Sequence, residues 1–239
     1  MAGEGERNDT AIHQGLMELD FQPLVLSFKL AAVATIILLL IGIPLAYWLS
    51  FSRRKYKYVL EALVSMPLVL PPTVLGFYLL ILLGPRSFLG GILDSCLDVR
   101  VVFSFAGLVV GSVIFSLPFM VNPIKAGFQS LPGYLTEAAL TLGKSRRETL
   151  FKVLLPNIKP SLWTGIVMSF AHTLGEFGVV LMIGGNIPGQ TRVASIAIYS
   201  EVEALNYSAA NFYSLVLIVV SFSILLVFYL LNKRMLKVF

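Results

Sequence analysis

Charge, cysteine and histidine are scarce in this chain. Only 13% of its 239 residues are charged, against about 25% in soluble domains. The single cysteine, Cys96, excludes an internal disulfide and supplies no zinc pattern. The two histidines form no metal-ligand cluster such as HExxH, and no nucleophile has recognisable histidine and acid partners. The sequence therefore gives no support to an enzyme.

Apolar residues take the place of the missing charge. Hydrophobic residues make up 57% of the chain and its mean hydropathy is +0.85. A lipid bilayer requires about 20 apolar residues for each helical crossing, and several stretches meet this requirement. We predict an all-α integral membrane protein with a single transmembrane domain at residues 21–239 and five spans, at 24–49, 59–83, 101–121, 162–183 and 212–231.

Two parts of the chain depart from simple spanning helices. Residues 1–20 are polar and rich in acids, which predicts an external tail, and the apolar run after them is too long for a cleaved signal peptide. In the second stretch, Pro67, Pro71 and Pro72 should break or kink the helix, because each removes a backbone donor and clashes with the preceding turn. Such a break either shapes packing or lines a cavity. A short outer-surface helix is expected at 193–204.

The remaining charges are sorted by side of the membrane. Of the 18 Lys and Arg residues, 13 lie at the C-terminus and in the loops 50–58 and 123–160, whereas nine of the 13 acids lie on the opposite side. Cytoplasmic loops carry the excess of Lys and Arg. We therefore place the N-terminus outside and the C-terminus and the 123–160 loop inside, and we expect no nucleic-acid partner.

The inner loop contains a pattern for two short helices. Gly143 can end the first helix in the left-handed conformation. Ser145 and Glu148 have the spacing of a capping box that starts the second, and Pro156 should end it by disfavouring helical geometry at Leu155. An amphipathic helix lying on anionic lipid is the alternative interpretation. The Gly143-Lys144-Ser145 sequence does not make a P-loop, since the required earlier glycine is Ala138, so we expect no ATP binding by this chain.

The same loop carries a motif with specific spacing. Glu137-Ala138-Ala139, Gly143 and the residues 153–156 match the pattern E-A-A, three residues, G, nine residues, I-x-L-P, with Val153 as the one departure. The chain thereby resembles type I ATP-binding-cassette (ABC) importer permeases from about residue 24 onward. PLVLPPTVLG at 67–76, TLGEFG at 173–178 and GNIPGQT at 185–191 resemble the molybdate permeases, neighbours of the sulfate permeases. Many relatives have a further N-terminal span, and here the acidic tail stands in its place.

The resemblance implies a machine of several parts. Two permease copies would form the pathway, two separate ATPase subunits would bind ATP-Mg and grip the loop 130–160, and a periplasmic or lipid-anchored binding protein would deliver the oxyanion. We expect a homodimeric inner-membrane permease for molybdate, with no cofactor of its own. Sulfate, thiosulfate and tungstate are alternative cargoes, and a passive channel or membrane enzyme is the alternative class. The residues matched to ATPase coupling are Glu137, Ala138, Ala139, Gly143, Arg146, Leu155 and Pro156.

The fourth span holds the polar residues that could meet the cargo. Ser169 and Thr173 are our candidates for transient oxyanion contacts, because hydroxyls donate hydrogen bonds without like charge; ordinary hydrogen bonding between helices is the alternative. Glu176 would repel a dianion. His172 and Glu176 have i, i+4 spacing, which would place them on one helix face as a structural or gating pair. A packing pair without functional effect and a proton-linked role are the alternatives.

Overall fold

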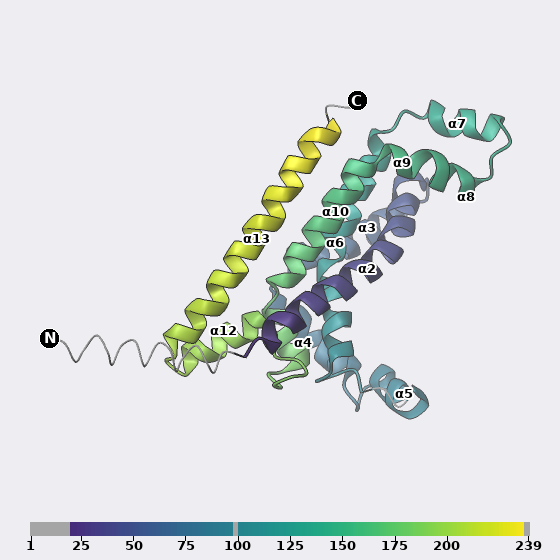
Figure 1. Ribbon diagram of the computed structural model, residues 1–239. Coiled ribbons are helices and arrows are strands. Elements are labelled where there is room, and N and C mark those ends of the chain that lie inside the picture. Colours follow the sequence, from purple (N-terminus) through teal and green to yellow (C-terminus); the bar gives the residue numbers. More distant parts are fainter. Residues whose placement is uncertain (1–19, 98–99, 237–239) are drawn as a thin grey trace.

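A computed structural model describes residues 20–97 and 100–236, with side chains for residues 20–92 and 100–230. Every regular element in these residues is a helix (Figure 1), so the predicted all-α class is confirmed there. The tail predicted at residues 1–20 lies outside the described residues, apart from its last residue. The side chain of Cys96 also lies outside the described part.

Three helices are each long and apolar enough to cross a membrane, and two bent helix pairs bring the number of candidate spans to at most five within the described residues. The long helices are α2 (Gln22–Phe51), α6 (Phe105–Ser130) and α13 (Tyr207–Leu236). The bent pairs are α3 (Lys57–Ser65) and η1 (Met66–Leu68) with α4 (Pro72–Leu83), and α10 (Lys159–Leu174) with α11 (Gly178–Gly184).

The other elements are short and lie at the ends of the long helices (Figure 1). At one end are α7 (Tyr134–Thr141), α8 (Arg146–Thr149), the π-helical turn η2 (Leu150–Leu154) and α9 (Leu155–Asn157). At the other end are α5 (Phe88–Leu97), which the sequence did not predict, and α12 (Ala194–Glu203), which confirms the helix predicted at 193–204.

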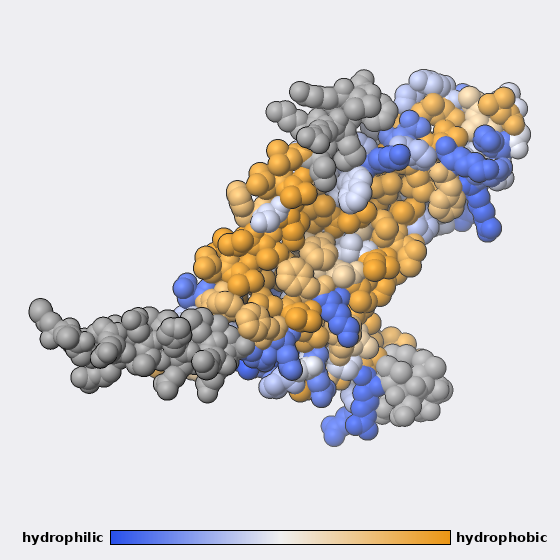
Figure 2. Space-filling model, in the orientation of Figure 1, coloured by the Kyte–Doolittle hydropathy of each residue, from blue (hydrophilic) through white to orange (hydrophobic). Residues whose placement is uncertain are grey.

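Hydropathy also changes from one end of the molecule to the other. Figure 2 shows a hydrophobic band over the middle, with hydrophilic residues gathered at the end that carries α7 and α8 and at the opposite end. The C-terminal end of α13 lies at the same end as α7 and α8, and the N-terminal end of α2 lies at the other (Figure 1). The distribution of charged residues in the sequence likewise predicts that the C-terminus and the 123–160 loop lie on one side and the N-terminus on the other.

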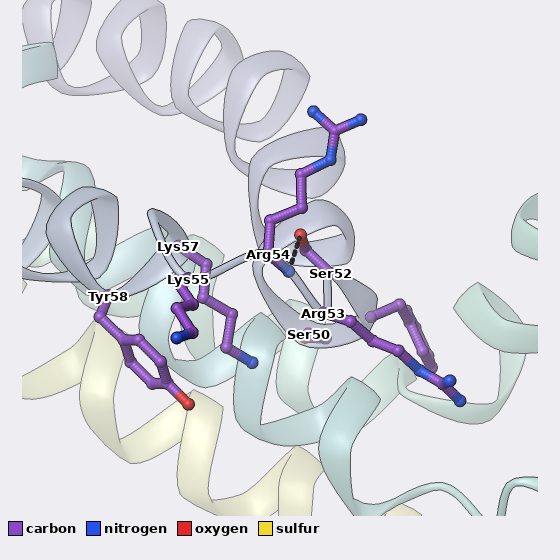
Figure 3. Close-up of a pocket in the computed structure, with 8 residues that line it drawn as sticks. Ser50, Ser52, Arg53, Arg54, Lys55, Lys57 and Tyr58 are labelled. Carbon is purple, nitrogen blue, oxygen red and sulfur yellow. Dashed lines mark hydrogen bonds between the residues drawn. The ribbon is translucent and has the colours of Figure 1, made fainter.

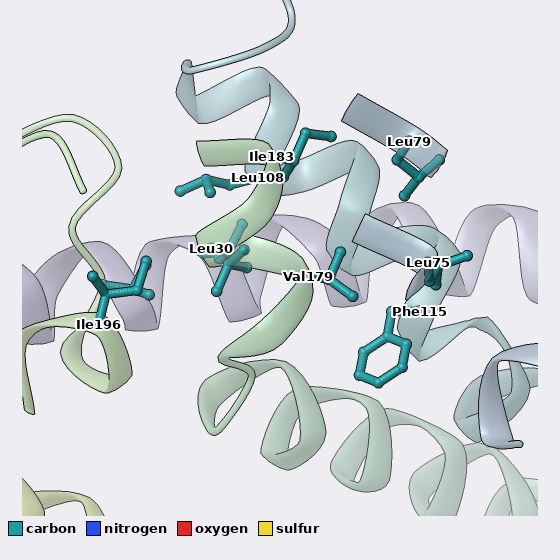
Figure 4. Packing of buried hydrophobic residues seen from close by; sticks show 10 residues of the cluster. Leu30, Leu75, Leu79, Leu108, Phe115, Val179, Ile183 and Ile196 are labelled. Atoms are coloured by element: carbon teal, nitrogen blue, oxygen red, sulfur yellow. The ribbon is translucent and has the colours of Figure 1, made fainter. Parts of the chain in front are cut away.

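Three buried clusters hold the described helices together, and the smallest of them packs Tyr213 of α13 against Leu24 of α2 and Ala194 of α12. The first joins α2, α4, α6, α11 and α12 and includes Leu30, Leu75, Leu108 and Ile183 (Figure 4). The second lies toward the α7–α8 end and joins α2, α3 and α6 to Leu154 and Ile158. Leu154 is buried although it belongs to the inner loop, so this loop is anchored in the core by its second half.

Proline breaks the second span as predicted. The chain leaves α3 through η1, and α4 starts again at Pro72, with a bend of 113° between the two parts. Pro72 occupies the first turn of α4, where a missing N–H costs nothing. The fourth span differs from the continuous helix that was predicted: α10 ends at Leu174 and α11 begins at Gly178, with a bend of 59°.

The prediction that Pro156 ends the second inner helix is wrong. Leu155 keeps helical angles, α9 continues through Pro156 to Asn157, and the chain breaks one residue later at Ile158. The turn before the proline is π-helical, with the N–H of Leu155 bonded to the carbonyl of Leu150. A π turn is wider than an α turn, and this widening relieves the clash between the proline ring and the preceding turn.

Candidate functional site

The turn between α7 and α8 is built as the sequence predicts. Gly143 has φ of +74°, in the left-handed region. Its N–H donates to the carbonyl of Leu140 at 2.9 Å, and the N–H of Lys144 donates to that of Ala139 at 3.0 Å. These two bonds make the Schellman motif, which satisfies carbonyls at a helix C-terminus. Gly143 therefore closes α7 and fixes the direction in which the chain leaves it.

The start of α8 confirms the predicted capping box. The N–H of Glu148 donates to Ser145 Oγ, and the N–H of Ser145 donates to the Glu148 carboxylate, both at 3.2 Å. Lys152 Nζ donates to the same carboxylate at 2.9 Å. The Lys152 hydrogen bond, followed by the backbone bond from Ser145, lowers the pKa of Glu148 to about 2. The hinge between α7 and α8 is thus fixed from both sides.

The residues matched to the coupling motif have two kinds of surroundings. Glu137, Ala138, Gly143 and Arg146 are exposed, whereas Ala139 is buried. Leu155 and Pro156 are half-buried, next to Leu154 in the second cluster. One half of the motif therefore faces outward at the end of the molecule, and the other half attaches it to the membrane helices.

A second candidate site lies where the two broken spans meet. A pocket of about 590 Å³ is lined by the start of α4, the turn between α10 and α11, and Phe115 of α6. The turn contributes Gly175, Glu176 and Phe177, and α4 contributes Pro72 and Thr73. Two of the three sequence segments that resemble the molybdate permeases therefore meet at this pocket, which we call the junction pocket. They are residues 67–76 and 173–178.

Two glycines make this junction possible. A Cβ at Gly178 would lie 2.7 Å from Cβ of Pro72, and a Cβ at Gly76 would lie 2.7 Å from Cβ of Met182. Neither helix could approach the other so closely with a larger residue at these positions. The contact between α4 and α11 thus depends on small residues at both ends.

His172 and Thr173 are held by α6. Ser116 Oγ lies 2.9 Å from Nδ1 of His172 and 2.9 Å from Oγ1 of Thr173. The His172 ring stacks on Phe119, with centroids 4.0 Å apart. Ser116 was not singled out in the sequence, although it has i, i+4 spacing with Ser112 in an apolar span.

The interpretation that His172 and Glu176 pair on one helix face is wrong. Helix α10 ends at Leu174 and turns at Gly175, so Glu176 lies beyond the helix that carries His172, although both residues line the junction pocket. The Glu176 side chain is 4% exposed, and neither carboxyl oxygen has a hydrogen-bond partner among the described residues. The Ser112 hydroxyl is close to this carboxyl, and it too has no hydrogen-bond partner among the described residues. The structural or gating role of the two residues stays a prediction.

Ser169 and Thr173 both point into the protein. Ser169 is 0% exposed and its hydroxyl lacks a hydrogen-bond partner among the described residues, while Thr173 is bonded to Ser116. Neither lines the junction pocket. Their contact with cargo therefore stays a prediction and requires a conformation that opens α10 from its neighbours. Across the described residues, His, Cys, Asp and Glu form no group of three or more that could hold a metal ion.

Sequence comparison finds close relatives of this chain. It is 42% identical over 214 residues to the molybdenum transport system permease protein ModB of Azotobacter vinelandii, covering 90% of this chain and 95% of the relative. It is 35% identical to the ModB protein of Escherichia coli K12, covering 79% and 82%. The sulfate transport system permease protein CysT of Salmonella typhimurium is 34% identical, over 83% of this chain and 70% of that protein.

Solved structures share the fold. The MetNI methionine ABC transporter superposes with a TM-score of 0.71 at 17% identity, over 92% of this chain and 97% of that chain. A bacterial ABC transporter for the import of alginate gives 0.75 at 18% identity, over 91% and 80%. The predicted importer-permease fold is confirmed by these matches. A family model matches residues 38–237, and the chain belongs to the binding-protein-dependent transport system inner membrane components.

Proposed function

We propose that this chain is the membrane-spanning permease of an ATP-driven oxyanion importer, with molybdate as its cargo. The α7–α8 hairpin projects at one end of the molecule (Figure 1). This is the single observation that best supports coupling of the chain to a separate ATPase. The relatives named for molybdenum transport support the cargo, because they match nearly the whole chain.

The outer surface of α7 supports a protein partner at this end. Tyr134 is 66% exposed and Leu142 is 79% exposed, and Ala138 between them is also uncovered. These residues form one apolar face with small side chains at its centre. We propose that this face docks into a separate ATPase subunit, which binds ATP-Mg, and that Gly143, Arg146 and Glu137 fix the docking geometry.

The rest of the assembly follows from the family. We propose that two copies of this chain form the pathway and that each engages one ATPase subunit inside. An oxyanion-loaded binding protein would dock at the opposite end, near α5 and α12, with the N-terminus outside and the C-terminus in the cytoplasm. Nucleotide and loaded binding protein would then bias the same two conformations from opposite ends.

The cargo has one neighbouring alternative. The CysT relatives make sulfate the second candidate, and thiosulfate and tungstate belong to the same chemical class. The junction pocket is lined by no Lys or Arg, and its titratable side chains, His172 and Glu176, give no basis for distinguishing one of these anions from another. Selection between them would rest mainly on the binding protein.

The test is ATP hydrolysis by the reconstituted complex in liposomes. The chain is co-purified with a candidate ATPase and a candidate binding protein from the same organism, and the binding protein is loaded with molybdate, tungstate or sulfate. Stimulation by molybdate is expected. Stimulation by sulfate alone would show that sulfate, and not molybdate, is the cargo. Failure of the chain to associate with any ATPase would overturn the coupling role and favour a channel.

A further inference from the structure

The loop between α2 and α3 is strongly basic. The residues 50–58 read SFSRRKYKY, with Arg53, Arg54, Lys55 and Lys57 and no acid. This segment, the basic loop, connects the end of α2 that lies near α8 and α9 to the start of α3 (Figure 1). It therefore lies at the inner membrane surface in the orientation that the charges predict.

The basic loop forms a pocket of about 660 Å³ (Figure 3). Lys55, Lys57 and Tyr58 project to one side of it, whereas Arg53 and Arg54 point away. Arg54 is already used, since its guanidinium donates to Tyr56 Oη at 2.7 Å. Within the described part of the chain no carboxylate pairs with Lys55 or Lys57. Two ammonium groups and a phenol thus share an open pocket that suits an anion.

An apolar stripe continues from the pocket along α3. Val59, Leu63 and Met66 are all exposed, and their i, i+4 and i+7 spacing places them on one face of the helix. The stripe begins directly after Tyr58, the last residue of the pocket. A ligand with an anionic head and a hydrocarbon tail would satisfy the pocket and the stripe together.

Aromatic residues mark this level as the membrane interface. Trp48 stacks on Tyr56, with ring centroids 5.4 Å apart, and Tyr58 lies against Lys57, whose Nζ is 5.5 Å from the ring centroid. Trp and Tyr concentrate at the headgroup level of bilayers. The pocket is therefore at the depth of lipid phosphates rather than out in the cytoplasm.

We propose that the basic loop binds the phosphate headgroup of an anionic phospholipid of the inner leaflet, with an acyl chain along Val59, Leu63 and Met66. A basic side chain near an anionic membrane surface contributes about a fivefold preference for anionic lipid. Lys55 and Lys57 together would give about 25-fold. A soluble protein partner would account for the cations and leave the apolar stripe on α3 unexplained.

Tryptophan quenching tests this proposal directly. The chain has two tryptophans, so Trp163→Phe leaves Trp48 beside the pocket as the reporter. The permease is placed in nanodiscs with brominated phosphatidylglycerol or brominated phosphatidylcholine at equal mole fraction. Brominated phosphatidylglycerol should quench Trp48 more strongly, and added salt should reduce the difference because it screens charge.

Matched variants separate binding from general electrostatics. Lys57→Gln should lower the preference about fivefold and Lys55→Gln with Lys57→Gln should abolish it. Arg86→Gln, which removes one exposed cation from the connection between α4 and α5, should leave the preference unchanged, because α5 lies at the opposite end of the molecule (Figure 1). Equal quenching by the two lipids, or an unchanged preference in the double variant, would overturn the proposal. A preference present in the permease alone and lost once the ATPase is bound would assign the loop to the ATPase instead.

Discussion

Gly178 lies directly against Pro72, and a Cβ on the glycine would come within 2.7 Å of Cβ of the proline. This contact joins the starts of α11 and α4, the second halves of the two broken spans. Prolines break the span that contains α4, a glycine turn breaks the span that contains α11, and the two breaks face the same pocket. The breaks in the two spans therefore pack against each other at this junction.

Gly178→Ala should destabilise the protein. The contacted atom belongs to a rigid proline ring, so α4 and α11 must separate, at a cost of about 1–3 kcal/mol. Thermal unfolding in detergent measures the effect. Gly133→Ala is the control, because a Cβ there has no atom within 4 Å. Equal melting temperatures for the two variants would contradict the packing at the junction.

Gly143→Ala should weaken coupling between ATP hydrolysis and transport. The space around Gly143 is open, so the cost is that of a left-handed backbone, about 1–2 kcal/mol. Gly143→Asn should retain more coupling, since asparagine tolerates this conformation. Stimulation of the ATPase by loaded binding protein is the readout. Equal ATPase stimulation in the alanine and asparagine variants would show that the left-handed backbone at Gly143 does not determine coupling.

Ser116→Ala should destabilise the protein more than Ser112→Ala. Ser116 bonds both His172 and Thr173, whereas the Ser112 hydroxyl has no hydrogen-bond partner among the described residues. Hydrogen bonds between membrane helices contribute about 0.6–1.7 kcal/mol. Thermal unfolding of the two variants, which remove the same atom one helical turn apart, provides the comparison. A larger loss with Ser112→Ala would show that the hydroxyl near Glu176 is the structural one.

Glu148 should titrate far below an ordinary glutamate. Its pKa of about 2 lies below the ordinary glutamate value of 4.5, so its contribution to the hinge is present above pH 4.5 and is lost as the pH falls through about 2. The carboxyl chemical shift measures this in nanodiscs. Lys152→Gln should raise the pKa of Glu148, because it removes the strongest hydrogen bond, and Arg147→Gln should change it little. An unshifted midpoint near 4.5 would refute the capping box in solution.

Ser169→Ala together with Thr173→Ala should reduce transport if these hydroxyls meet the cargo. In the described conformation both are buried, so the effect should appear in cargo uptake into liposomes rather than in basal ATP hydrolysis. Thr173→Ser keeps the hydroxyl and is the control for the bond to Ser116. Full transport by the double alanine variant would remove both residues from the pathway.

Local signals in the sequence determined the turn between the two helices of the inner loop and the break in the second span. Gly143, the Ser145–Glu148 box and the prolines of the second span act on their own backbone within a turn or two, so their effects could be predicted without the fold. Hydropathy and charge likewise determined the apolar band and its two polar ends.

Tertiary structure decided where these elements meet. Helix α10 ends before Glu176 and the Glu176 carboxyl has no hydrogen-bond partner among the described residues, although the i, i+4 spacing predicted a pair with His172. The π turn before Pro156 carries the helix through a residue that should have ended it. The contact of Ser116 with His172 joins residues 56 positions apart. The Ser116 contact and the burial of Leu154 in the π turn against α2 and α6 depend on packing between segments distant in the chain, and no local pattern records such packing.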